Sequence, residues 1–259
     1  MSTPSSPSPI GLFPGERALV TGSASNIGRA IAIALAREGA HVICVDVDAA
    51  RNADTVAAIA RAGGSAAAAT ADLSTREGWR AALPEQPVHM LVHSASPPRR
   101  ETDGSLAVSE ETWDAMVNTN LRSGFFMARE TGRAMRDAGL KGRILFITSL
   151  HAGTPRNIAH YSAAKAGQTM AVKELARALG PAGIRVNALA PGAVPGGGFN
   201  AGLHDFSDKV PLGRLGTGED MADMALALLS DRFSGYVTGT TVAVDGGLAL
   251  YNWIALPQD

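Results

Sequence analysis

The sequence is poor in cysteine, in net charge and in long apolar runs. One of its 259 residues is cysteine, so no disulfide can form within a single chain, and the apolar run HVICV around Cys44 predicts a buried small side chain. A formal net charge of −1 gives no electrostatic reason to expect nucleic acid or an anionic membrane as the main partner. No apolar run approaches the ~18 residues that a membrane-spanning helix needs.

The first residues, MSTPSSPSPIGLFPG, contain neither a basic segment nor an apolar core of the kind found in secretory signals. Their Ser and Pro content predicts a disordered tail over residues 1–11, followed by one domain over residues 12–259. Together with the lone cysteine, this start favours a cytoplasmic protein.

Patterns typical of metal sites and of serine hydrolases are also missing. His93, His151 and His160 have no HExxH or carboxylate-rich spacing around them, so we expect no metal site. No G-x-S-x-G sequence is present.

Short apolar runs alternate with helical patterns along the whole chain. Strands are predicted at 17–21, 41–46, 65–72, 88–95, 142–149, 184–190 and 240–245. Helices are predicted at 26–38, at about 110–138 and 160–179, and at 218–230. This alternation predicts an α/β fold, a single Rossmann-type doubly wound domain of about seven parallel strands with helices on both faces.

One Gly- and Pro-rich segment is longer than a compact fold needs for a connection. It covers residues 191–216, and we expect a substrate lid at about 193–215. Phe199, Leu203 and Phe206 within it suggest a partly apolar ligand.

A strand, a small-residue loop and a helix follow one another in RALVTGSASNIGRAIAIALA. Gly22 and Gly28 stand where the strand ends and the helix begins, which is the context required for binding a pyrophosphate at a helix N-terminus. The second strand ends at Asp46, whose carboxylate could accept the ribose hydroxyls of NAD and repel the 2′-phosphate of NADP. No Lys or Arg occupies 23–27, so NAD is the expected cofactor.

Tyrosine and lysine are scarce, with three and four residues respectively, yet Tyr161 and Lys165 stand four apart. On a helix this spacing puts both on one face. A neighbouring ammonium favours the phenolate form of tyrosine, which makes it usable as an acid and base. Ser149, at the end of a predicted strand, could polarise a carbonyl oxygen, with Thr148 as the neighbouring alternative.

From about residue 12 to 250 the chain resembles the short-chain dehydrogenase/reductase family. The matching pieces, in order, are TGSASNIG, ADLS, NTNLRSGFF, FITS, YSAAK, IRVNALAPGAV, PLGRLG and VTGTTVAVDGG. Three features depart from the family pattern. Asn26 replaces a glycine, HSAS at 93–96 replaces Asn-Asn-Ala-Gly, and the Ser149-to-Tyr161 spacing is twelve where thirteen is commoner. Asn tolerates left-handed backbone best among the residues other than glycine, so the loop should survive the first change.

The resemblance implies a set of site residues. The implied catalytic residues are Asn120, Ser149, Tyr161 and Lys165, with Asn120 holding a water of the proton relay. The implied cofactor-binding residues are Gly22, Ser25, Asn26, Ile27, Asp46, Asp72, Leu73, His93, Ser94, Ala95, Tyr161, Lys165, Pro191, Gly192 and Val194. The expected substrate-binding residues are Ser96, Ser149, His151, Tyr161 and Phe199.

The resulting prediction is an NAD(H)-dependent oxidoreductase that interconverts a secondary alcohol and a ketone, with Tyr161 as the acid and base. Two alternatives stay open: a 3-oxoacyl-carrier-protein or pterin reductase of the same family, and a non-catalytic relative that binds a dinucleotide. The expected partners are a small-molecule alcohol or ketone and further copies of the chain, as a homotetramer or dimer. The apolar C-terminal segment ALYNWIALPQD is expected at that interface.

Overall fold

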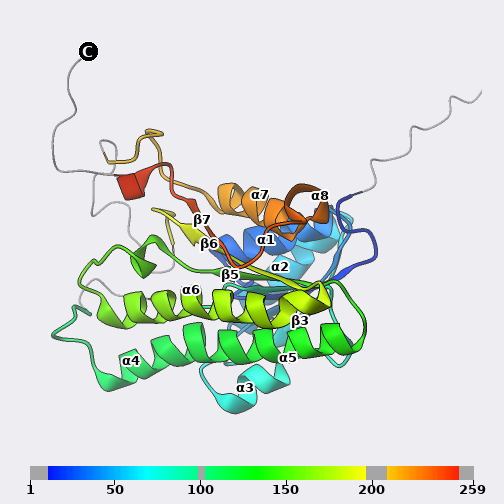
Figure 1. Ribbon diagram of the computed structural model, residues 1–259, viewed down its shortest axis with the longest axis horizontal. Helices are drawn as coiled ribbons and strands as arrows, with labels where there is room; N and C mark the ends of the chain where they lie inside the picture. Colours follow the sequence, from blue (N-terminus) through cyan, green and yellow to red (C-terminus); the bar gives the residue numbers. More distant parts are fainter. Residues whose placement is uncertain (1–10, 99–102, 197–208, 251–259) are drawn as a thin grey trace, which may run out of the picture.

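The computed structural model describes residues 11–98, 103–196 and 209–250 (Figure 1). Most of the predicted tail, the centre of the predicted lid with Phe199, and residues 251–259 of the C-terminal segment lie outside this part. In the described residues, no helix combines the length and the apolar character that crossing a membrane requires.

Seven parallel strands form one sheet in the order β3-β2-β1-β4-β5-β6-β7, which confirms the predicted fold class. Each strand lies within or close to its predicted range. The strands are β1 (Arg17–Thr21), β2 (His41–Asp46), β3 (Ser65–Thr70), β4 (Met90–His93), β5 (Arg143–Ile147), β6 (Arg185–Pro191) and β7 (Thr241–Val244).

Helices cover both faces of the sheet. They are α1 (Asn26–Arg37), α2 (Ala49–Arg61), α3 (Arg76–Ala81), α4 (Glu110–Val117), α5 (Ser123–Asp137), α6 (Ala159–Leu179), α7 (Gly218–Leu229) and α8 (Asp231–Ser234). Figure 1 shows α1 and α7 on one side of the sheet and α5 and α6 on the other. Right-handed crossovers place helices on both faces here, because the strand order runs outward from β1 in both directions.

Successive residues of the central strands point into two separate cores. Val20 and Val92 pack against α1 and α7, whereas their neighbours Leu19 and Leu91 pack against α5 and α6. The strands β4, β5 and β6 are buried along their whole length. This is why their sequences are mostly apolar instead of alternating, apart from His93, Arg143, Arg185 and Asn187. The edge strand β3 differs, since most of its residues are exposed.

The long helix predicted over 110–138 is not a single α-helix. Five residues, Asn118–Arg122, form a π-helix between α4 and α5. Its wider turn is marked by the bond from the backbone N–H of Ser123 to the carbonyl of Asn118, five residues back. Such insertions are rare and occur often at functional sites, and this one contains Asn120.

Candidate active site

The strand order reverses direction between β1 and β4, and the candidate site lies at the carboxyl ends of these strands. Ligands of doubly wound sheets bind at such a point. Gly22 follows β1 with a φ of 70°, and a Cβ there would lie 2.8 Å from Ala95 Cα in the segment after β4. A Cβ on Gly28 would lie 2.1 Å from the carbonyl oxygen of Gly22. Only glycine therefore lets α1 begin directly against the strand end.

The start of α1 leaves its first backbone amides without a side-chain cap. Ser25 is the N-cap residue, and its hydroxyl does not bond to the helix. Asn26 has a φ of 47°, so the expected left-handed conformation of this residue is confirmed. Its neighbour Ile27 lies in the first turn. Uncapped amides at a helix N-terminus suit a pyrophosphate.

Helix α2 supports the loop between β1 and α1. The Ser23 hydroxyl donates to Asn52 Oδ1 at 2.8 Å, and the Thr55 hydroxyl donates to the Ser23 carbonyl at 2.9 Å. All three residues are buried. Sequence reasoning missed Asn52 and Thr55, because nothing in their own helix pattern distinguishes a side chain that points to the loop.

Asp46 is held in place by backbone. Its Oδ2 accepts from the N–H of Ala24 and its Oδ1 from the N–H of Asp48, both at 3.0 Å. The residue borders a cavity of about 290 Å³. Several other residues predicted to contact cofactor or substrate line the same cavity, namely Gly22, Asp72, Leu73, Ala95 and Ser96. Three features together fit an adenine dinucleotide: the close backbone approach at Gly22 and Gly28, the uncapped N–H groups at the start of α1, and the Asp46 carboxylate.

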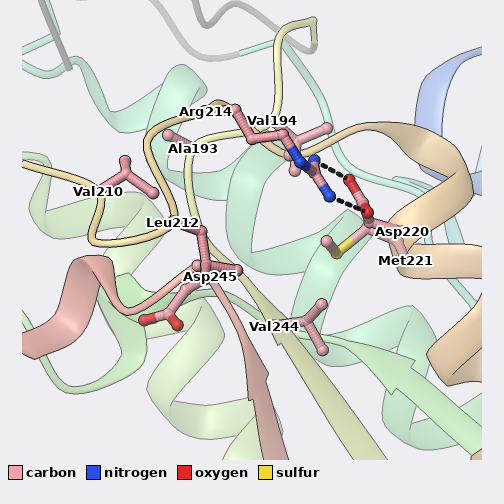
Figure 2. A pocket seen from close by; sticks show the side chains of 11 residues that line it. Ala193, Val194, Val210, Leu212, Arg214, Asp220, Met221, Val244 and Asp245 are labelled. Carbon is pink, nitrogen blue, oxygen red and sulfur yellow. Dashed lines mark hydrogen bonds and ion pairs between the residues drawn. The ribbon is translucent and has the colours of Figure 1, made fainter. Parts of the chain in front are cut away.

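Pro191 ends β6, and the chain then turns toward the predicted lid. A Cβ on Gly192 would lie 2.6 Å from Asp245 Cα, so the two segments cross closely. A small cavity of about 80 Å³ lies beside this crossing. Figure 2 shows the residues that line it, among them Val194 and residues from the far end of the predicted lid segment. There the Arg214 guanidinium binds both oxygens of the Asp220 carboxylate at 2.7 Å. This pair joins the segment before Gly216 to the start of α7.

Tyr161 and Lys165 lie one turn apart near the start of α6, as predicted. The Lys165 ammonium nitrogen is 5.5 Å from the centre of the Tyr161 ring and donates to the Ile147 carbonyl at 2.8 Å. Both side chains are nearly buried, with 9% and 2% of their surfaces exposed. The bond to Ile147 ties this turn of α6 to the carboxyl end of β5.

Ser149 is linked to the tyrosine through His151, whereas Thr148 is not. Thr148 donates its hydroxyl to the Leu189 carbonyl at 3.0 Å, so that group is committed to the sheet. The Ser149 oxygen accepts the backbone N–H of His151 at 3.2 Å, and the His151 ring packs edge-on against Tyr161 with 5.9 Å between ring centres. These contacts bring Ser149, His151 and Tyr161 together.

The His93 side chain is buried inside the fold and is not among the residues that line the 290 Å³ cavity. The imidazole is fully buried, and Nδ1 lies 3.2 Å from the Thr21 hydroxyl, while Nε2 lies 3.1 Å from the carbonyls of Thr119 and Asn120. Burial, reinforced by the Lys165 ammonium, lowers the pKa of His93 to about 4. Its backbone leads into Ser94 and Ala95, whose N–H groups both bond to Thr21 Oγ1.

Asn120 lies in the π-helix and is fully buried. Its amide nitrogen donates to the Met116 carbonyl at 3.0 Å, whereas its side-chain oxygen has no hydrogen-bond partner among the residues that the structure describes. Over the described ranges, no group of three or more His, Cys, Asp or Glu residues is placed to hold a metal ion.

Comparison with known proteins places this geometry among oxidoreductases. A family model described as enoyl-(acyl carrier protein) reductase matches residues 22–249. The chain is 37% identical to the (3R)-3-hydroxyacyl-CoA dehydrogenase of Mus musculus, over 89% of this chain and 95% of that protein. It is 36% identical to 3beta-hydroxysteroid dehydrogenase 1 of Eggerthella lenta, over 92% and 95%.

Solved structures of similar fold are also dehydrogenases. A gluconate 5-dehydrogenase from Burkholderia cenocepacia J2315, in complex with NADP and tartrate, superposes with a TM-score of 0.84 at 30% identity. The match covers 94% of this chain and 99% of that one.

Proposed function

This chain belongs to the short-chain dehydrogenase/reductase family, and from that premise we propose that it is an NAD(H)-dependent enzyme interconverting a secondary alcohol and a ketone. The observation that carries the proposal is the Tyr161–Lys165 turn, which His151 links to Ser149. Ser149 follows the carboxyl end of β5, and Asp46, which borders the 290 Å³ cavity, stands at the carboxyl end of β2. A proton donor, a cation and a hydroxyl group near the carboxyl end of β5 are the groups that carbonyl reduction needs.

The nicotinamide ring of the cofactor supplies or accepts the hydride when bound. Tyr161 moves the hydroxyl proton, giving it to the oxygen during reduction and taking it during oxidation. Ser149 donates a hydrogen bond to the same oxygen and polarises the carbonyl. Lys165 favours the phenolate by its positive charge, and the Ile147 carbonyl orients its ammonium.

Asp46 is the basis for proposing NAD over NADP. Several structural relatives hold NADP, so family membership alone leaves this choice open. In this chain, two backbone amides fix the Asp46 carboxylate at the cavity wall. A carboxylate held there would face the 2′-phosphate of NADP at close range, and two like charges at that distance repel.

The experiment that tests the proposal is a spectrophotometric screen for NADH formation and consumption. The panel contains small secondary alcohols, a 3-hydroxyacyl thioester, a 3-hydroxysteroid and a sugar acid, with the matching ketones in reverse. A 3-oxoacyl-carrier-protein, a pterin and an enoyl thioester test the other reductases of the family. Tyr161→Phe is the control, since it keeps the ring and removes the proton. We expect its turnover to fall by roughly 10²–10⁴.

Two outcomes would contradict the proposal. Cofactor binding without turnover of any compound would favour the non-catalytic alternative. Wild-type turnover in Tyr161→Phe would place the chemistry elsewhere.

We further propose a cytoplasmic homotetramer. The long helices α5 and α6 lie side by side on one face (Figure 1) and offer the extended surface that such an assembly needs. A molar mass from light scattering at micromolar concentration tests this, and a monomeric mass would overturn it.

A further inference from the structure

Two buried side chains from different parts of the fold bind the backbone carbonyl of Asn120. His93 Nε2, at the end of β4, lies 3.1 Å from this oxygen, and Gln168 Nε2, on α6, donates to it at 2.8 Å. Both residues are fully buried. The carbonyl thus sits between the sheet and the helix that carries the tyrosine.

The partners of His93 define which ring nitrogen carries the proton. Nε2 faces the carbonyls of Thr119 and Asn120, which can only accept, so Nε2 must donate. Thr21 Oγ1 accepts the N–H groups of Ser94 and Ala95 and donates its own proton to Nδ1. The neutral ring therefore joins the end of β1, the segment after β4 and the π-helix.

Gln168 connects the same carbonyl to the catalytic turn. It lies three residues after Lys165 and seven after Tyr161, so all three share one face of α6. Its contact with Asn120 is the only hydrogen bond formed by its amide nitrogen within the described residues. Gln168 thereby joins the π-helix to the face of α6 that carries Tyr161 and Lys165.

Gly124 provides the room for the histidine ring. A Cβ at residue 124 would lie 2.8 Å from His93 Cδ2 and 2.9 Å from Nε2. These distances are shorter than real Cβ contacts. A smaller side chain at 93 would remove these two contacts and leave the one to Phe146 Cε1 at 3.0 Å, so the His93 ring depends on glycine at 124.

We propose that His93 and Gln168 are positioning residues that clamp the Asn120 carbonyl and thereby align the Tyr161–Lys165 turn with the cofactor loop. For its catalytic consequence the inference rests on the proposed function. The clamp itself is a property of the fold. Neither residue needs to touch substrate or cofactor.

Conservative variants test the hydrogen bonds of the two ring nitrogens of His93 one at a time. His93→Gln keeps a donor that reaches the Nε2 position, whereas His93→Asn keeps a polar group only near the Nδ1 position. Gln168→Met keeps the length of the side chain and removes its donor. His41→Asn and Gln86→Met are matched controls, because these residues make exposed contacts with Ser65 and Arg17.

The first measurement is hydrogen exchange of peptides covering the π-helix, which requires no substrate. We expect His93→Asn and Gln168→Met to raise exchange at residues 118–124 by about tenfold or more, and His93→Gln and both controls to leave it near wild type. Gly124→Ala should raise it too, and His93→Asn should suppress part of that added effect, since the contact of the new Cβ with Phe146 stays. Unchanged exchange in both clamp variants would overturn the proposal even in an active enzyme.

The second measurement is kcat, KM and the pH profile, with the folded fraction determined in parallel. We expect His93→Asn and Gln168→Met each to lower kcat about tenfold at unchanged KM for the cofactor and to move the kcat profile toward higher pH. The double variant should be little worse than either single one, because both hold one carbonyl. Loss of activity in proportion to the unfolded fraction, with an unmoved profile, would overturn the proposal.

Absence of turnover in the wild type would instead contradict the proposed function, and the exchange result would still decide on the clamp.

Discussion

The Lys165 ammonium nitrogen lies 5.5 Å from the centre of the Tyr161 ring and is held there by its bond to the Ile147 carbonyl. The lysine is therefore oriented by the backbone of β5 before any cofactor binds. Its positive charge lies close to the Tyr161 ring, so a substitution that removes this charge tests its effect on the tyrosine.

Lys165→Met should lower turnover and shift the remaining activity to higher pH. Methionine preserves the helix and the packing, but the phenolate of Tyr161 loses the adjacent positive charge that favours it. NAD affinity should also weaken, since the family resemblance implies a contact from this ammonium to the nicotinamide ribose. Turnover against pH, with cofactor affinity by fluorescence titration, checks both effects. Lys173→Met, farther along the same helix, is the control. An unmoved pH profile in Lys165→Met would argue against the assigned role.

Asp46→Asn should narrow the preference for NAD over NADP by about tenfold or more in kcat/KM, corresponding to about 1.4 kcal/mol. The substitution removes the charge that faces a 2′-phosphate and keeps one oxygen as acceptor for one of the two amides, of Ala24 and Asp48, that hold Asp46. Initial rates with each cofactor give the ratio. Asp48→Asn serves as control, because Asp48 caps α2 at the N–H of Arg51 instead of facing the cavity. Equal use of the two cofactors by the wild type would show that Asp46 does not select between them.

His93 should make folding stability depend on pH between about 6.5 and about 4. The imidazole of the unfolded chain takes up a proton in this window, while the buried ring, with its pKa lowered mainly by burial, does not. Stability therefore falls as the pH falls through the window, by roughly 3 kcal/mol in total. Urea unfolding at several pH values measures this dependence. The slope should flatten in His93→Gln and stay in His41→Gln. Identical slopes for wild type and His93→Gln would contradict a neutral buried ring.

Asp220→Ala should destabilise the fold by about 1 kcal/mol, as typical for a lost N-cap partner. Its carboxylate accepts the N–H of Thr217 in a capping box at the start of α7, besides binding Arg214 (Figure 2). Arg214→Ala should cost less, under about 1 kcal/mol, because the guanidinium is largely exposed. Denaturant unfolding of both variants shows which substitution lowers the free energy of unfolding more. A larger loss in Arg214→Ala would mean that the ion pair matters more than the cap.

The Arg214 guanidinium, followed by the Thr217 amide, holds the pKa of the Asp220 carboxyl well below its usual range. The stabilisation is therefore present above the ordinary pKa of 3.8 and is lost as the pH falls below it. The difference in stability between wild type and Asp220→Ala should shrink at low pH.

Local patterns in the sequence by themselves determine much of this protein. Apolar runs alternating with helical periodicity predict all seven strands. Strands buried on both faces, such as β4, β5 and β6, are mostly apolar, which makes such runs visible in the sequence. The glycine spacing around Gly22 and Gly28 predicts the cofactor loop, because only a residue without Cβ fits that crossing. The spacing of Tyr161 and Lys165 predicts one shared helix face for the same kind of reason, as it depends only on helical geometry.

Contacts between distant segments are decided only by the tertiary structure. The π-helix at Asn120 has no local sequence signal, and the pattern there predicts a regular helix. The partners of the His93 ring also gave no local signal. The ring bonds to Thr21 and to the π-helix, because parallel register places Thr21 opposite His93 and Gly124 leaves space behind it. Gln168 gives no signal at all, since on its own helix it is one more buried residue. Which partner a buried polar group meets depends on how the elements pack, and periodicity within one element carries no information about that.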